Sequence, residues 1–249
     1  IARDTNDKDT TRGTALQVLG ERWPDRDDTY TTVLTTVHDT DASTPARDAA
    51  LQVLGERWPD RDDTYTTVLK VARDRDSNSR DVAARVLSKR WPDRDDAYTT
   101  VLEIARDTND NASDYGSGYA CSAALHALGE RWPDRDDTYT TVLEIARDTN
   151  DRGKDTTRGT ALQVLGEQWP DRDDTYTTVL EIARDTNAND YARYSALQVL
   201  GERWPDRDDT YTTVLEIARD TNDKDTTRGT ALQVLGERWP DRDDTYTTV

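Results

Sequence analysis

The sequence has little of what catalytic and disulfide-stabilised proteins use. Among its 249 residues there is one cysteine, Cys121, and there are two histidines, His38 and His126. A single cysteine excludes a disulfide bond within the chain. The sequence contains no Gly-rich phosphate loop and no GxSxG, HExxH or CxxC motif. We therefore expect no enzyme activity, no catalytic residue, no cofactor and no metal ligand.

Long apolar runs and positive charge are also scarce. No stretch is long and apolar enough for a transmembrane helix. The chain has 51 acidic residues against 33 Lys and Arg, and its net charge is −18. Such a surface repels nucleic acids and anionic membranes, so we expect neither as a partner, and we expect a cytoplasmic location. An excess of Asp over Glu and of Arg over Lys resembles the composition of proteins from salt-adapted organisms.

What the sequence has instead is repetition. Copies or near copies of "ERWPDRDDTYTTVL" begin at Glu21, Glu56, Lys89, Glu130, Glu167, Glu202 and Glu237. The tryptophans of successive copies are 35, 33, 41, 37, 35 and 35 residues apart, a spacing that fits one pair of helices per repeat. The chain opens and closes inside a repeat, so we expect a fragment of a longer array. As a single repeat-array domain it divides at about 1–34, 35–69, 70–102, 103–143, 144–180, 181–215 and 216–249.

Each repeat predicts two helices. In "DTTRGTALQVLGERW", which ends at Trp23, the apolar residues follow a helical spacing and the helix is expected to stop at the Trp-Pro step. The predicted N-cap lies fourteen residues before each tryptophan, at Asp9, Thr44, Ser77, Gly118, Asp155, Asp190 and Asp225. In the second segment, Tyr98, Val101, Leu102 and Ala105 fall on one face of a helix, with Asp93 as the expected N-cap.

The phrase "WPDRDD" is therefore interpreted as a boundary that ends one helix and starts the next. The alternative is calcium binding by its aspartates. An EF-hand loop requires a central Gly and a bidentate Glu at its twelfth position, and the phrase has neither. One repeat cannot bury enough apolar surface to fold alone, so we expect the repeats to stack into an all-α solenoid.

The first helices resemble those of HEAT repeats, and more distantly those of armadillo repeats. "SNSRDVAARVLSKRW" and "DTTRGTALQVLGERW" carry an early Arg followed by an A-x-x-x-L or A-L-x-x-L-G core. In HEAT arrays such an arginine typically pairs with an Asp of the same or a neighbouring repeat. The resemblance thus implies a structural ladder formed by Arg12, Arg47, Arg80, Arg158, Arg193 and Arg228, with Cys121 in its place in the fourth repeat. The wording "ALxxLGxxWPD" is also similar to the C-terminal HEAT arrays of bacterial NACHT-type defence NTPases, in which the array senses the ligand.

The copies differ mainly in the linkers between repeats. The fourth linker adds Tyr115 and Tyr119, and the sixth linker, "ARDTNANDYARYS", adds Tyr191 and Tyr194. These tyrosines are candidate partner contacts, with the alternative that they cover helix ends. The structural core is predicted to contain Trp23, Trp58, Trp91, Trp132, Trp169, Trp204 and Trp239.

The sequence therefore predicts a non-catalytic protein-interaction scaffold, such as the ligand-sensing arm of a larger NTPase. Near-identical helices present near-identical surfaces, so the expected partner is a protein that is itself repetitive or a second copy of the array. The alternatives are an architectural rod or filament and a calcium-stabilised extracellular repeat protein.

Overall fold

The computed structural model describes residues 2, 9–107, 117–149 and 155–248. The regular secondary structure of these residues consists of α-helices, two per repeat. They are α1 (Asp9–Arg22), α2 (Asp27–His38), α3 (Thr44–Arg57), α4 (Asp62–Arg73), α5 (Arg80–Arg90), α6 (Asp95–Ala105), α7 (Ser117–Arg131), α8 (Asp136–Arg147), α9 (Asp155–Gln168), α10 (Asp173–Arg184), α11 (Asp190–Arg203), α12 (Asp208–Arg219), α13 (Asp225–Arg238) and α14 (Asp243–Thr248).

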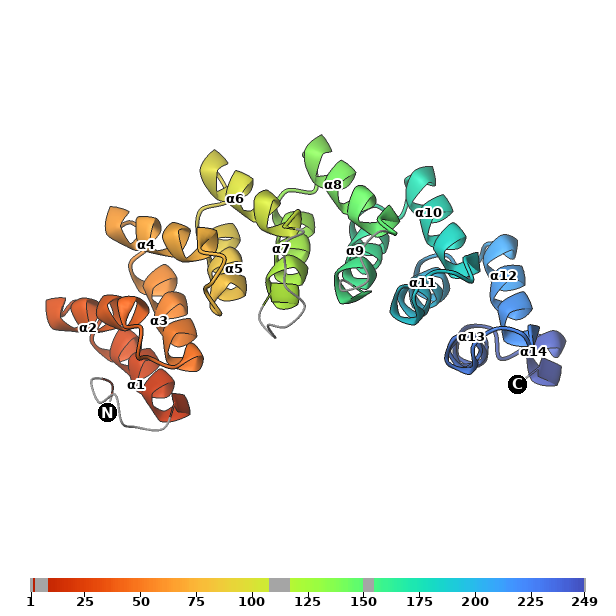
Figure 1. The fold of residues 1–249 in the computed structure, drawn as a ribbon, viewed down its shortest axis with the longest axis horizontal. Coiled ribbons are helices and arrows are strands. Elements are labelled where there is room, and N and C mark those ends of the chain that lie inside the picture. Colours follow the sequence, from red (N-terminus) through yellow and green to blue (C-terminus); the bar gives the residue numbers. More distant parts are fainter. Residues whose placement is uncertain (1, 3–8, 108–116, 150–154, 249) are drawn as a thin grey trace. The chain divides into compact units, whose positions relative to one another are not determined.

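The helices form two compact units, Ile1–Trp132 and Pro133–Val249. In the first unit the first helices of successive repeats, α1, α3, α5 and α7, pack side by side (Figure 1). The second helices, α2, α4 and α6, pack against them, each between the first helix of its own repeat and that of the next. The second unit repeats this pattern, with α9, α11 and α13 in one layer and α8, α10, α12 and α14 in the other. This nearest-neighbour packing confirms the predicted all-α helical-repeat solenoid.

The first helices are buried on more than one side, because they pack against neighbouring first helices, as α3 does against α1 and α5, and also against second helices. In α11 the buried positions include Ala196, Leu197, Val199 and Leu200. The second helices bury a single stripe. In α6 this stripe contains the predicted Tyr98, Val101, Leu102 and Ala105, together with Ile104. None of the described helices is long and apolar enough to cross a membrane.

The predicted helix starts are shifted. The residues at the expected N-cap positions are already helical in six repeats, and in α3, α11 and α13, where the cap is described, it lies one residue earlier. At α11 the cap is Asn189, whose side chain accepts a hydrogen bond from the Ala192 N–H at 2.6 Å. In the third repeat α5 begins only at Arg80, because a turn in which the Arg80 N–H donates to the Ser77 C=O precedes it.

The second helices also start later than predicted. The cap of α6 is Arg94 rather than Asp93, and it makes no side-chain capping bond. The Arg94 N–H donates to the Trp91 C=O at 3.2 Å, which closes a turn over the Trp-Pro-Asp-Arg segment and delays the helix. Asp95 and Asp96 then occupy the first helical turn, where negative charge is favourable.

A close approach between neighbouring first helices explains the glycine of the "LGER" segment. A Cβ atom added at Gly55 would lie 2.4 Å from Val86 Cγ1, and one added at Gly20 would lie 2.4 Å from Val53 Cγ1. The second unit shows the same approach of Val199 to Gly166 at 2.4 Å. The missing side chain of each of these glycines thus leaves a space that a valine of the following repeat occupies.

This packing predicts opposite effects for two equivalent substitutions. Gly55→Ala should lower the free energy of unfolding by about 1–2 kcal/mol, because overpacking costs more than the gain in helix propensity returns. Gly236→Ala should raise it by about 0.5–1 kcal/mol, since nothing lies within 4 Å of a Cβ added there. Urea denaturation of both variants is the measurement, and adding Val86→Ala should relieve part of the Gly55→Ala defect. Equal effects at the two glycines would contradict the described packing.

Candidate interaction surfaces

Six of the seven tryptophans form the same junction with the preceding repeat. Each indole packs edge-on against a tyrosine of that repeat, with ring centroids 5.1–5.4 Å apart. Each indole N–H donates to a proline C=O of the same repeat at 2.8–3.1 Å. The Tyr–Trp pairs are Tyr30–Trp58, Tyr65–Trp91, Tyr98–Trp132, Tyr139–Trp169, Tyr176–Trp204 and Tyr211–Trp239.

Other residues of the phrase reach across the same junction. The Arg61 guanidinium lies 3.9 Å from the centroid of the Tyr30 ring, a cation–π contact that recurs at four other described junctions. The Tyr30 hydroxyl lies 3.3 Å from the Thr64 hydroxyl. The tryptophan, proline, arginine, threonine and tyrosine of "WPDRDDTY" therefore bind one repeat to the next. The junctions share this set, except that Ala97 replaces the threonine in the third repeat, and this shared role explains why the phrase recurs.

Trp23 departs from the prediction of a core tryptophan. Its side chain is 49% exposed, whereas the other six tryptophans are 6–9% exposed. Among the described residues no tyrosine ring packs against Trp23, because no earlier second helix with that ring is present there. The burial of this tryptophan type thus depends on a neighbouring repeat and not on its own.

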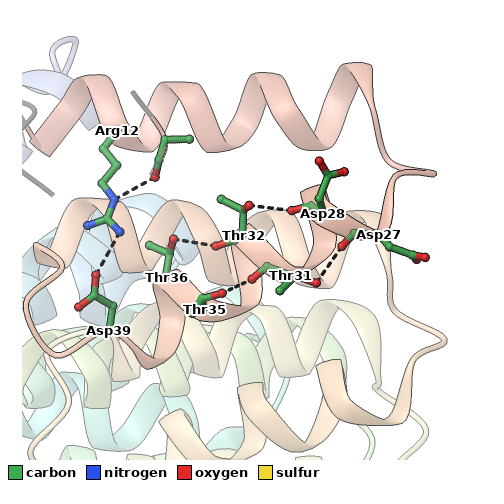
Figure 2. A pocket seen from close by; sticks show the side chains of 9 residues that line it. Arg12, Asp27, Asp28, Thr31, Thr32, Thr35, Thr36 and Asp39 are labelled. Atoms are coloured by element: carbon green, nitrogen blue, oxygen red, sulfur yellow. Dashed lines mark hydrogen bonds and ion pairs between the residues drawn. The ribbon is translucent and has the colours of Figure 1, made fainter. Parts of the chain in front are cut away.

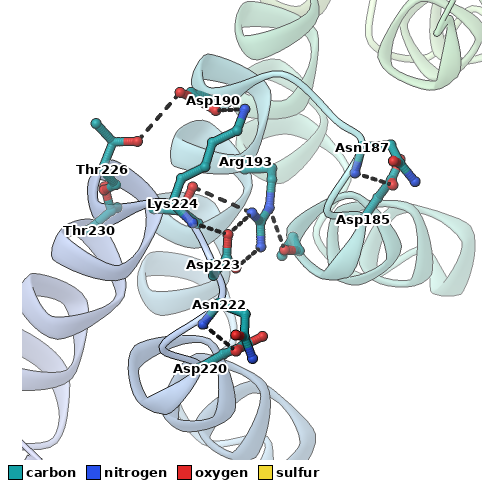
Figure 3. A network of polar contacts seen from close by, with 12 residues as sticks. Asp185, Asn187, Asp190, Arg193, Asp220, Asn222, Asp223, Lys224, Thr226 and Thr230 are labelled. Atoms are coloured by element: carbon teal, nitrogen blue, oxygen red, sulfur yellow. Dashed lines mark hydrogen bonds and ion pairs between the residues drawn. The ribbon is translucent and has the colours of Figure 1, made fainter.

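The predicted arginines lie at the ends of second helices. Arg193 is 1% exposed, and its Nε donates to the C=O of Ala183 in the last turn of α10 at 3.1 Å (Figure 3). Its two terminal nitrogens donate to the Asp223 carboxylate at 2.5 and 2.6 Å. A guanidinium is favourable at the negative end of a helix and forms strong paired bonds with a carboxylate.

The other predicted arginines follow this arrangement to different extents. Arg80 bonds the Ala72 C=O at 3.1 Å and pairs with Asp107 at 2.9 Å. Arg12 bonds the Ala2 C=O and pairs with Asp39 at 3.1 Å, and Arg158 bonds the Ala146 C=O. In the described structure the Nε atoms of Arg47 and Arg228 have no hydrogen-bond partner. Cys121, which replaces the arginine in the fourth repeat, donates through Sγ to the Ile104 C=O of α6 at 3.3 Å.

The Arg193–Asp223 pair predicts a loss of stability in acid. The hydrogen bonds from Arg193 lower the pKa of Asp223 below its ordinary value of 3.8. Because the folded-state pKa is the lower one, this contribution is present above pH 3.8 and is lost as the pH falls through the folded-state pKa. Urea denaturation between pH 5 and pH 2 should show a shallower acid dependence for Asp223→Asn than for the unsubstituted protein. An unchanged slope would contradict this coupling.

The predicted contact tyrosines that are described lie not in linkers but near the N-terminal ends of α7 and α11. Tyr119 is 68% exposed, and Tyr191 and Tyr194 are 41% and 42% exposed. Tyr115 lies outside the described residues. Tyr191 also packs over α9, since its ring leaves no space for a Cβ atom at Gly159, and its centroid is 6.3 Å from that of Tyr194. The Tyr191 ring therefore covers a first helix with one face, and both rings are partly exposed to solvent.

The second helices present a regular exposed stripe. In α6 it consists of Asp95, Thr99 and Glu103, which lie four residues apart on one face. We call this stripe and its equivalents on the other second helices the polar ridge. The Glu position is occupied by Thr35, Lys70, Glu103, Glu144, Glu181 and Glu216. Because α4 packs with α6, and α10 packs with α8 and α12, the ridges of these helices lie side by side.

Two types of cavity open beside second helices. One, of about 590 Å³, lies against α2 and is shown in Figure 2. Arg12 and Asp39 pair at one end of it, and Asp27 and Asp28, at the start of α2, lie at the other end. Another, of about 440 Å³, lies between α4 and α6. Four arginines line it: Arg73, Arg75, Arg80 and Arg106. Arg80 and Arg75 both pair with Asp107, so part of this positive charge is already neutralised.

The histidines and acidic side chains of the described residues form no metal site on these surfaces. His38 and His126 are both exposed, on α2 and α7. No group of three or more His, Cys, Asp or Glu side chains in the described part of the chain is placed to hold a metal ion. The calcium alternative stays a prediction, which a melting curve with and without chelator tests.

No protein-family model matches the chain, and no curated protein matches it with significance.

Proposed function

We propose that the chain is a non-catalytic protein-interaction scaffold of the HEAT-like kind. The observation that carries the proposal is the polar ridge, which repeats the same Asp and Thr on successive second helices, with Glu at the third position from α6 to α12. A surface with the period of the repeat suits a protein partner that is itself repetitive. In a longer protein the array would serve as a ligand-sensing arm, as in the NTPases that its sequence resembles.

Two features of the described structure support this assignment. The buried ion pair of Arg193 with Asp223 holds one repeat to the next. The ridge side chains are exposed, and their threonines satisfy their hydroxyls on the helix itself, as Thr99 does by donating to the Asp95 C=O at 2.8 Å. The ridge glutamates Glu103, Glu181 and Glu216 are exposed, so a partner with basic groups can reach their carboxylates.

A charge-reversal experiment tests the proposal. The ridge variant carries Glu103→Lys, Glu181→Lys and Glu216→Lys. The control variant carries the same charge change on exposed positions of first helices, through Glu21→Lys, Glu130→Lys and Glu167→Lys. Each protein is immobilised, and the proteins that it retains from its source extract are identified and then purified for titration. The proposal expects partners whose affinity falls at least tenfold for the ridge variant only. Partners that do not distinguish the variants, or no protein partner, would contradict it.

A further inference from the structure

The cavity between α4 and α6 is positively charged, although the chain as a whole carries a net charge of −18. Its volume is about 440 Å³, and its acidic lining residues are Glu103 and Asp107. Against these two carboxylates stand four arginines, a formal excess of two positive charges. The cavity beside α2 has the opposite balance, since one arginine and three aspartates line it. We call the positive cavity the arginine pocket, after Arg73, Arg75, Arg80 and Arg106.

One arginine of the pocket, Arg75, is specific to its linker. The other six copies of the linker have threonine at this position: Thr5, Thr40, Thr108, Thr149, Thr186 and Thr221. The turn around Arg75 keeps its usual hydrogen bond, in which the Asp76 N–H donates to Asp74 Oδ1 at 3.1 Å. In the sixth linker the Asn187 N–H donates to Asp185 Oδ1 at 2.9 Å in the same way. The exchange of threonine for arginine therefore adds charge to a linker whose turn is retained.

A buried carboxylate holds two of the arginines in place. The Asp107 side chain is 3% exposed, and its Oδ2 pairs with Arg80 Nη1 at 2.9 Å and with Arg75 Nε at 3.2 Å. Arg80 is fixed further by its Nε, which donates to the Ala72 C=O at 3.1 Å. One negative charge is thus shared by two guanidinium groups. Because these groups are already ordered, a ligand that binds them loses less free energy to side-chain ordering.

Donors for a ligand come from the ends of both second helices. Arg75 forms its ion pair through Nε, and Arg73 donates through Nε to the Thr100 hydroxyl at 3.1 Å. Both side chains are exposed, so their terminal nitrogens can donate to a bound anion. Arg106 lines the pocket from the end of α6. Guanidinium groups bind oxyanions through paired N–H bonds, which suits phosphate and carboxylate groups.

We propose that the arginine pocket binds a phosphate dianion, either free or as the monoester of a small molecule. A phosphate monoester carries about −1.5 to −2 charges near pH 7, which matches the excess of two positive charges in the pocket. A carboxylate carries half of that charge. The volume of about 440 Å³ also has room for a small organic group attached to the phosphate.

The acidic surface around the pocket selects for a small ligand. At physiological salt, charges separated by more than about 8 Å are largely screened, so a small anion in the pocket responds mainly to the nearby arginines. A nucleic acid or an anionic membrane would bring many negative charges against the rest of the surface, which repels them. The inference goes beyond the proposed protein scaffold, because its ligand is a small anion and Arg75 does not belong to the polar ridge.

Isothermal titration calorimetry of the 249-residue protein tests the inference, with inorganic phosphate, glycerol phosphate and acetate as probes. The titrations are done at about 0.15 M NaCl and about pH 7.5, where the phosphate groups are close to doubly ionised. We expect phosphate to bind with a Kd on the order of 0.1–1 mM and acetate to bind at least tenfold more weakly. Tighter binding of glycerol phosphate than of inorganic phosphate would identify an organic monoester as the ligand, and equal binding would identify phosphate itself.

Three variants assign the binding to the pocket. Arg75→Thr introduces the residue of the other copies and should weaken phosphate binding at least tenfold. Arg85→Thr is the matched control, since Arg85 is also exposed and pairs with Asp81 at 3.0 Å outside the pocket, and it should leave the affinity unchanged. Glu103→Gln should tighten binding about threefold, because it removes a negative charge from the lining. A gain in affinity cannot come from a misfolded variant.

Absence of phosphate binding at about 10 mM would overturn the inference. Acetate binding as tight as phosphate binding would also overturn it, as would equal losses for Arg75→Thr and Arg85→Thr. An affinity that Glu103→Gln leaves unchanged or lowers would show that the pocket is not the site. None of these results depends on a protein partner, so the phosphate site and the ridge proposal fail separately.

Discussion

Replacing Arg193 by methionine is expected to lower the free energy of unfolding by about 3–5 kcal/mol. The substitution removes the charge that neutralises Asp223, whose side chain is 4% exposed, and leaves a buried carboxylate without its paired donor. It also removes the donor to the Ala183 C=O. Methionine keeps most of the apolar stem, so the loss reports on the guanidinium and not on a cavity.

The matched control is Arg228→Met, at the equivalent position of the last described first helix. The Arg228 side chain is 29% exposed, and its recorded ion pair is with Asp225, which is 99% exposed. We expect this control to cost less than about 1 kcal/mol. Urea denaturation measures both variants. Similar losses at the two positions would show that the buried Arg193–Asp223 pair is not the source of the effect.

Replacing Trp91 by alanine is expected to cost about 3–5 kcal/mol. The variant loses a large buried side chain, its edge-on contact with Tyr65 at 5.1 Å and its hydrogen bond to the Pro59 C=O. Trp23→Ala is the matched control, since Trp23 is half exposed and has no tyrosine beside it in the described structure. Its cost should be less than half as large. If the two variants lose equal stability in urea, the tryptophans act within their own repeats and the junction contributes little.

The order of helices could be predicted from the sequence because the period, the Trp-Pro step and the apolar spacing all indicate the same helix pair. The second-helix starts could not, since Arg94 has no capping side chain and the delay comes from a turn closed by its backbone N–H. The sequence predicts the tryptophans as core residues, but the tyrosine partners of the six buried ones lie in the preceding repeat. Apolar periodicity within one repeat carries no information about which ring of a neighbour each indole meets.

A paired change between adjacent copies indicates the contact between first helices from the sequence alone. In the third repeat Ser88 replaces the glycine of "LGER", and in the fourth repeat Ala127 replaces the valine that elsewhere fills the hole. Both residues are buried, on α5 and α7, which pack together. The larger residue on one helix is thus matched by a smaller one on the next. A comparison of adjacent copies could have found this paired change and, from it, the contact between first helices.

The arginine positions were also predictable, whereas their acidic partners were only partly so. Arg12 and Arg80 pair with the aspartate just after the second helix of their own repeat, Asp39 and Asp107. Arg193 pairs with Asp223, which lies farther along its linker. Because the linkers differ in sequence, the aspartate that pairs with the arginine stands at a different linker position in different repeats.

The central claim is that the recurring phrase is an interface between repeats. A double-mutant cycle tests it most directly, with Tyr65→Leu and Trp91→Leu as the pair across a junction and Tyr65→Leu with Trp58→Leu as the pair within one repeat. Unfolding free energies from urea denaturation should give a coupling of about 0.5–1.5 kcal/mol across the junction and near zero within the repeat. Coupling within the repeat and additivity across the junction would contradict the claim.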